Sequence, residues 1–371
     1  MDLTGRRPGP DVVRDTMDLT SRRPGPDVVR AVALIGVVVM NYHGYLILRG
    51  GPRGGGWAHD LFDPWSGPLS TRFAATFVLV AGVGVTLLTR SALGDEGRTR
   101  TLRWRLAKRG LLLYFVGLYF EEIWNGAILP YYGAMFLLAA WLFTLRIRWL
   151  VAIGLLAALA GWAVRWWLFE RELDGHSTRW LTSPPRLSLH GLVYDVFVNG
   201  THPLLPWLAF FCAGIVLGRL LDTSWWRPAA IGGGFTLFTI ANLVNASASG
   251  KRVLVLTSTD PFDRGLVYVM SALGTALIAF AAIAWLADRS TQAALVDVLR
   301  RAGQMSLTLY LAHALVFNLV VDWLGWIRPT GLDTALLFSA GFWIAGIAAA
   351  VAWQRRFGRG PAEALYRRLT V

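Results

Sequence analysis

The chain has 371 residues, of which 55% are hydrophobic and only 16% are charged, and its formal net charge is +13. Soluble domains carry roughly 25% charged residues, so this composition excludes an ordinary soluble protein and indicates an integral membrane protein. The positive charge does not indicate nucleic-acid binding, because Arg and Lys cluster at the ends of apolar runs, as the positive-inside rule predicts. The single cysteine, Cys212, excludes an internal disulfide framework and a thiolate metal cluster.

The N-terminus contains a duplicated segment. Residues 1–14 read MDLTGRRPGPDVVR and residues 17–30 read MDLTSRRPGPDVVR, so the copies differ at one position. Only the second copy runs directly into an apolar segment, which favours a duplicated start over a functional tandem motif. We expect residues 1–27 to form a disordered extension.

Apolar runs follow that are long enough to cross a bilayer, which takes roughly 20 residues. They predict an all-α polytopic membrane protein, a bundle of about ten transmembrane helices. The predicted spans are residues 28–48, 68–89, 107–122, 127–145, 149–168, 203–220, 228–246, 265–287, 302–325 and 331–354. Glu121 and Glu122 interrupt the third, so a re-entrant pair is the alternative for the third and fourth spans. This divides the chain into a transmembrane domain, 28–354, and a basic cytoplasmic tail, 355–371.

The basic residues give an orientation for this bundle. Most of the 36 Lys and Arg fall on one side, including the dense segment 90–109 and both termini. The positive-inside rule then places both termini in the cytoplasm. Lys108 and Lys251 are the only lysines, a usage typical of a GC-rich bacterial genome, so we expect a multi-pass protein of the bacterial plasma membrane.

The histidines are unevenly distributed along this map. His43, His59, His176, His190 and His202 fall at or near the outer side, which favours proton transfer there, although loop histidines can simply be solvated. His59 lies in the segment WAHDLFDPW, where Asp60 can orient its imidazole and stabilise the charged form. No histidine pair has the spacing of a zinc motif, so we predict no metal.

Polar residues also occur inside apolar runs. Asn41 follows a wholly apolar stretch, and a buried amide there needs hydrogen-bond partners. In the ninth span, spacings of three and four residues predict one polar helical face, which either forms a hydrogen-bonded packing seam or lines an active-site cavity. That face comprises Gly303, Ser306, Tyr310 and His313.

Two groups of arginines can bind anions. Arg72 lies just inside the second span, where it should pair with a carboxylate or bind an anionic ligand. The cluster that includes Arg105 and Arg109 is explained by topology and attraction to anionic lipid, or by recognition of a phosphorylated cytosolic cofactor.

From Asp27 onward the sequence resembles the bacterial YeiB-like and heparan-alpha-glucosaminide N-acetyltransferase-like transmembrane acyltransferases. Four patches carry the resemblance. They are Met40-Asn41-Tyr42 with the following outer loop, RGLLLYFVG at 109–117 with ILPYYGAMF at 128–136, HPLLPWLAFFCAG at 202–214, and the stripe from Gly303 to His313.

The resemblance implies transfer of an acyl group from cytosolic acetyl-CoA, or another acyl-CoA, to an acceptor across the membrane. Asn41 then matches the family's asparagine and His59 its loop histidine, while related acyltransferases favour His43 instead. His59 is the expected base or acyl carrier, Asn41 the oxyanion donor and Asp60 the orienting carboxylate. Arg105 and Arg109, with Arg72, are expected to bind the cofactor, since guanidinium suits phosphate geometry.

The expected partners are the lipid bilayer and a carbohydrate or glycolipid acceptor, with a homodimer as a further expectation. Two other classes stay open. A transporter or flippase would use the outer His and Asp residues as a proton relay, and repeated broken spans would support it. A noncatalytic sensor or assembly protein would need no acyl donor.

Overall fold

The computed structural model describes residues 23–185 and 188–370, which form helices and no strand. The first copy of the duplicated segment lies outside the described residues. The longer helices are α2 (Gly25–Leu48), α4 (Arg72–Thr89), α5 (Glu96–Phe120), α6 (Leu129–Leu142), α7 (Ile147–Leu173), α10 (Leu204–Leu220), α11 (Trp226–Ala246), α13 (Leu266–Arg289), α14 (Ala294–Gln304), α15 (Ser306–Phe317), α16 (Leu332–Phe357) and α17 (Pro361–Thr370). Short connecting helices are α3 (Trp57–Leu61), η1 (Arg90–Ala92), α8 (Arg179–Thr182), α9 (Leu189–Tyr194), η2 (Asp195–Asn199), α12 (Lys251–Thr257), η3 (Pro261–Asp263) and η4 (Asn318–Trp323). The all-α prediction is confirmed.

Within the described residues, seven helices are long and apolar enough to cross a membrane. An eighth is added if Leu189–Asn199 and Leu204–Leu220, which meet at 58°, count as one bent span. The third and fourth predicted spans correspond to α5 and α6, but α5 begins with a strongly basic half and α6 has only 14 residues. The chain is therefore an all-helical, multi-pass membrane protein with fewer clear spans than the ten expected.

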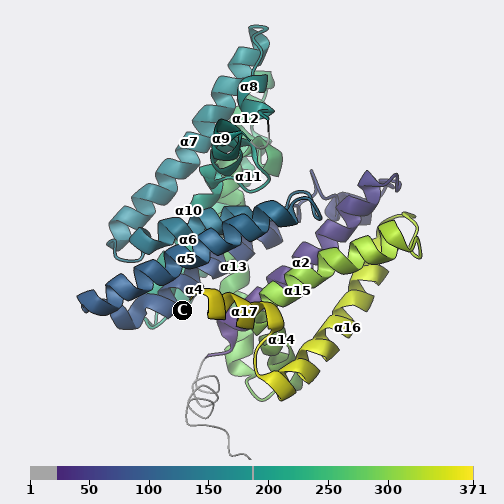
Figure 1. The fold of residues 1–371 in the computed structure, drawn as a ribbon. Coiled ribbons are helices and arrows are strands. Elements are labelled where there is room, and N and C mark those ends of the chain that lie inside the picture. Colours follow the sequence, from purple (N-terminus) through teal and green to yellow (C-terminus); the bar gives the residue numbers. More distant parts are fainter. Residues whose placement is uncertain (1–22, 186–187, 371) are drawn as a thin grey trace, which may run out of the picture.

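The helices run between two ends of the bundle (Figure 1). At the basic end, α2 begins, α4 ends and α5 begins with its run of arginines. At the loop end, α2 ends and the chain continues through residues 49–71. Helix α2 begins at Gly25, so its first turn includes residues that were expected to belong to the N-terminal extension.

Glycines allow two pairs of helices to approach closely. A Cβ atom on Gly214 of α10 would lie 2.0 Å from the Leu79 carbonyl oxygen of α4, and one on Gly82 would lie 2.2 Å from the Phe211 carbonyl oxygen. Helices α5 and α6, side by side in Figure 1, meet in the same way at Gly110 and Gly133. Small residues permit this backbone approach, which strengthens van der Waals packing between membrane helices.

The predicted ninth span is interrupted. Met305 leaves the helical conformation, with φ −109° and ψ 26°, so α14 ends at Gln304 and α15 begins at Ser306 with a different direction (Figure 1). The prediction of one helical face from Gly303 to His313 was therefore wrong for Gly303, which belongs to α14. Helix α14 carries Asp297, Arg300 and Arg301 on a strongly amphipathic helix, which suits the membrane interface better than the hydrocarbon core.

Candidate functional site

A cavity of about 750 Å³ extends from the basic end into the bundle between α2, α4, α5, α6 and α15. Its lining changes character along its length. Charged residues at the basic end include Arg23, Asp27, Arg30, Arg90, Arg109 and Glu363, apolar residues include Phe77, Ala81, Val85, Leu113 and Phe136, and the far end contains Ile128, Tyr132 and Tyr310. This gradient suits a ligand with an anionic head and a less polar tail.

The cations of the lining differ in their partners. Arg30 pairs with Asp27 at 3.1 Å and Arg90 with Asp222 at 3.6 Å. Arg109 instead donates through Nε to Thr370 Oγ1 at 3.5 Å and lies 5.4 Å above the Tyr366 ring. In the part of the chain that the structure describes, no ion pair joins Arg109 to a carboxylate. Of these three arginines, Arg109 is the one whose charge is left for an anionic ligand.

Two phenols at the far end of the cavity can donate hydrogen bonds. The Tyr310 hydroxyl accepts a hydrogen bond from the Ile128 backbone N–H at 3.0 Å, which leaves its own proton for another acceptor. The Tyr132 hydroxyl is buried and has no hydrogen-bond partner among the described residues. Because a buried hydroxyl without a partner is costly, a ligand oxygen at this position would be stabilised.

Above this end of the cavity, α2 and α15 bring Asn41 to His313. Asn41 continues the α2 face that carries Arg30 and Leu34, and His313 lies one turn beyond Tyr310. The Tyr310 carbonyl accepts a hydrogen bond from His313 Nδ1, so Nε2 is the nitrogen that accepts from Asn41 Nδ2 at 3.2 Å. Both imidazole nitrogens are therefore engaged, which makes His313 a residue that positions Asn41.

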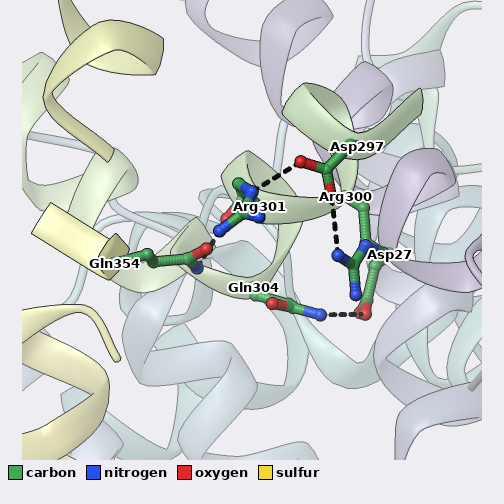
Figure 2. A network of polar contacts seen from close by, with 6 residues as sticks. All are labelled: Asp27, Asp297, Arg300, Arg301, Gln304 and Gln354. Carbon is green, nitrogen blue, oxygen red and sulfur yellow. Dashed lines mark hydrogen bonds and ion pairs between the residues drawn. The ribbon is translucent and has the colours of Figure 1, made fainter. Parts of the chain in front are cut away.

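A polar network joins α14 to the start of α2 at the mouth of the cavity (Figure 2). Asp27 accepts hydrogen bonds from Arg30 on one carboxylate oxygen and from Gln304 Nε2 on the other, each at 3.1 Å. Gln354 of α16 donates to the Arg301 carbonyl oxygen at 3.1 Å. The network fixes the direction in which α14 leads into α15.

The Asp297 carboxylate gives this network a pH dependence. Burial raises its pKa, but hydrogen bonds from Arg300 and Arg301, at 2.6 and 2.7 Å, outweigh that effect and hold the pKa below its usual range. A lowered folded-state pKa stabilises the protein above the unfolded-state pKa of about 3.9, and this contribution is lost as the pH falls through the folded-state value. We expect Asp297→Asn to lower the free energy of unfolding between pH 5 and 8 by less than about 1 kcal/mol, because these ion pairs are partly exposed. The thermal unfolding midpoint should fall slightly as a result. The difference from wild type should begin to shrink as the pH falls below about 3.9 and be lost as the pH passes the lower folded-state pKa. A difference that stays constant as the pH is lowered from about 5 to about 2 would contradict this.

The two candidate catalytic histidines lie at the loop end. His43 Nδ1 donates to the Phe62 carbonyl oxygen at 2.8 Å, and its Nε2 is buried and has no partner within the described chain. His59 lies half-buried on α3, with its ring against Gly54, while Asp60 is exposed. His43 is thus the histidine with an oriented ring and an unoccupied nitrogen.

Two family models match the sequence. Residues 22–246, more than half of the chain, match the model described as heparan-alpha-glucosaminide N-acetyltransferase, catalytic. The chain belongs to this family. Residues 210–371 match a model described as a protein of unknown function (DUF418), so the suspected resemblance is confirmed. No curated protein matches the chain.

In this N-acetyltransferase family member, both matched regions build the cavity. Helices α2, α4, α5 and α6 belong to the first match, whereas α15 and α17 belong to the second. The catalytic-domain match alone would therefore leave out Tyr310, Glu363 and Tyr366 of the lining.

The structure brings some predicted residues together and separates others. Ser306, Tyr310 and Arg109 line the cavity, and Asn41 meets His313 beyond its far end. A separate group lies elsewhere: His43, His59, Asp60, Arg72 and Arg105 are not among the lining residues. Asn41 and His43, two positions apart on α2, point to different sides of that helix.

Arg72 faces α13 and not the cavity. Its Nη2 donates to Ser271 Oγ at 3.0 Å and its guanidinium lies 5.6 Å from the centre of the Tyr268 ring. Its Nη1 is buried and unpartnered in the described part of the chain, which shows no ion pair between Arg72 and a carboxylate. The structure therefore does not supply the carboxylate partner that the sequence left open.

Among the lining residues that sequence reasoning missed are Tyr132, Glu363 and Tyr366. Tyr132 lies in the segment ILPYYGAMF, which was used only for the resemblance. Glu363 and Tyr366 lie in the segment expected to be a basic tail, where the structure has helix α17. The sequence signal for α17 was the spacing of Tyr366 and Thr370, which lie four residues apart and so share one helical face. In the structure both residues contact Arg109.

Proposed function

We propose that this protein is a transmembrane acetyltransferase whose cavity binds an acyl-CoA, with acetyl-CoA the expected donor. The observation that carries the proposal is a cavity with two groups that have charge or a hydrogen bond to offer a ligand. Among the described residues, the arginine at one end has no carboxylate partner and the buried tyrosine hydroxyl at the other has no hydrogen-bond partner. Arg109 suits a phosphate, and the phenols of Tyr132 and Tyr310 suit a thioester carbonyl.

The residues support a direct mechanism of acyl transfer. Tyr132, Tyr310 and the second N–H of Asn41 would donate hydrogen bonds to the carbonyl oxygen as negative charge develops on it. A base at the loop end would take the proton from the acceptor hydroxyl or amine as that oxygen or nitrogen attacks the carbonyl carbon. His43 is the candidate because its Nε2 has no partner within the described chain. It lies outside the cavity lining and on another side of α2 from Asn41, so the thioester would have to extend past Asn41 to reach it. The carbon–sulfur bond then breaks, and CoA leaves as the thiolate. His59 is the alternative base that the resemblance favoured.

The orientation follows from charge. With the basic end in the cytoplasm, as the positive-inside rule requires, the cavity opens toward cytosolic acyl-CoA and both termini are cytoplasmic. The acceptor, a sugar or glycolipid, would then be acylated at the outer side of a bacterial plasma membrane, near the loop end.

Thermal unfolding of the detergent-purified protein tests the proposal. A ligand that binds only the folded state stabilises it by about 2.7 kcal/mol at one hundred times its Kd. We expect acetyl-CoA and CoA to raise the unfolding midpoint, and ATP at the same concentration not to do so. A midpoint that saturating acetyl-CoA leaves unchanged would reject an acyl-CoA donor.

The same preparations distinguish the two histidines. Release of the CoA thiol from acetyl-CoA, with amino sugars as trial acceptors, should fall by about 10²–10⁴ in His43→Ala if that residue is the base. His59→Ala is the matched comparison, and both variants should keep the thermal stabilisation by acetyl-CoA. Loss of thiol release only in His59→Ala would transfer the assignment to that residue.

A further inference from the structure

Helix α17 is built into the mouth of the cavity. Helix α16 ends at Phe357, Gly358 takes a left-handed conformation with φ 76°, and the chain turns back into α17. Helix α17 then lies against α5 and α15 (Figure 1). Its residues Glu363 and Tyr366 line the cavity. The C-terminal helix is thus a structural part of the site.

Glu363 fixes the position of α17. Its Oε1 accepts hydrogen bonds from the backbone N–H groups of Leu307 at 2.7 Å and Thr308 at 3.1 Å, and its Oε2 accepts from Thr308 Oγ1 at 2.5 Å. The Ala362 backbone N–H donates to the same Thr308 oxygen at 3.1 Å. The first N–H groups of a helix have no partner within it and favour a negative charge. Glu363 therefore joins α17 to the first turn of α15 and is itself fully used.

Arginines meet where α17 crosses α5. Arg105 lies one helical turn before Arg109 on α5, and Arg367 follows Tyr366, the α17 residue whose ring the Arg109 guanidinium covers. The like charges of both arginines therefore act on Arg109. Tyr366 lies under the Arg109 guanidinium, and Thr370 accepts a weak hydrogen bond from its Nε. Grouped guanidiniums repel one another and form a ready site for a phosphate, which accepts several charge-assisted hydrogen bonds.

We propose that α17 carries half of a phosphate-binding site, in which Arg367 acts together with Arg109 and Arg105. This inference rests on the proposed function, and it assigns the bound phosphate to the nucleotide part of the acyl-CoA. The position favours that source over a lipid headgroup, because Arg109 lines the same cavity as Tyr132 and Tyr310. One ligand can therefore contact Arg109 and still extend along the cavity toward the two phenols.

The test measures ligand affinity of the full-length protein in phosphatidylcholine nanodiscs. The ligands are CoA, 3′-dephospho-CoA and pantetheine, which carry successively fewer phosphates. The variants are Arg109→Ala, Arg367→Ala and the matched control Arg368→Ala. Arg368 follows Arg367 on α17 but points about 100° away around the helix. Thermal midpoints without ligand show whether each variant is folded. If Arg367→Ala is not folded, Arg367→Gln replaces it.

We expect Arg109→Ala and Arg367→Ala each to weaken CoA binding about tenfold or more, since each removes a charge-assisted hydrogen bond. Pantetheine binding should stay within about twofold of wild type, and Arg368→Ala should bind CoA as wild type does. Equal losses in Arg367→Ala and Arg368→Ala, or no loss in either, would overturn the phosphate site and leave the acyl-CoA proposal standing. No CoA binding by the wild type would overturn both.

Nanodiscs that contain phosphatidylglycerol distinguish the two sources of phosphate. Unchanged CoA affinity of the wild type in these nanodiscs supports the donor assignment. If phosphatidylglycerol reduces the CoA affinity of the wild type to that of Arg367→Ala, the lipid headgroup occupies the phosphate site. That result would overturn the assignment of the site to the acyl-CoA.

Discussion

Replacing Asn41 with alanine is expected to slow acyl transfer by about 10²–10³-fold while leaving the affinity for acetyl-CoA nearly unchanged. Losses of this size follow removal of one preorganised oxyanion donor. The Asn41 amide is preorganised because His313 Nε2 holds it at 3.2 Å, and the Tyr310 carbonyl in turn holds His313 Nδ1. Since the charge on the oxygen develops only in the transition state, kcat should fall and KM should change little.

Asn318→Ala is the matched control for this prediction. Asn318 is also a buried amide, but its Nδ2 donates to the Ile123 carbonyl oxygen at 2.7 Å and it does not line the cavity. Its replacement should lower thermal stability without a selective loss of kcat. The role assigned to Asn41 would be wrong if both variants lost kcat equally, or if Asn41→Ala lost acetyl-CoA binding.

The residue pattern alone predicted the helical membrane fold and several residues of the site. Asn41 and His313 were each recognised because a polar side chain in an apolar run needs a partner. Their pairing could not be predicted, because 272 positions separate them and only the contact of α2 with α15 brings them together. A helical period fixes which residues share a face, but it does not fix which other helix that face meets.

The break at Met305 shows a second limit of the pattern. The predicted span began at residue 302, so the sequence placed the last three residues of α14 and all of α15 in one helix, whereas the structure breaks the chain at Met305. The break depends on contacts distant in sequence, above all the hydrogen bonds from the start of α15 to Glu363. The same contacts turn the expected basic tail into helix α17. The charge of that segment predicted which side of the membrane it lies on. Its packing against α15 depends on the Glu363 carboxylate, which the charge pattern did not distinguish from other acidic residues.

The contact of Gly303 with the first turn of α2 leads to the second large effect. A Cβ atom on Gly303 would lie 1.9 Å from the Asp27 backbone carbonyl oxygen, far inside van der Waals contact. A backbone oxygen cannot rotate away as a flexible side chain can, so Gly303→Ala must displace α14 from α2. Overpacking of this kind costs about 1–3 kcal/mol, and more where neither backbone can yield.

This displacement should also affect the cavity, because Asp27 and Gln304 both line it and are joined by a hydrogen bond of 3.1 Å. We therefore expect Gly303→Ala to lower the thermal unfolding midpoint and, unlike Asn41→Ala, to reduce the stabilisation by acetyl-CoA. Gly233→Ala on α11 is the control, since a Cβ atom there meets nothing within 4 Å and alanine is the better helix former. Equal midpoints for the two glycine variants would show that α14 can move away from α2 at no cost, and the cavity mouth would then be adaptable and not fixed by this contact.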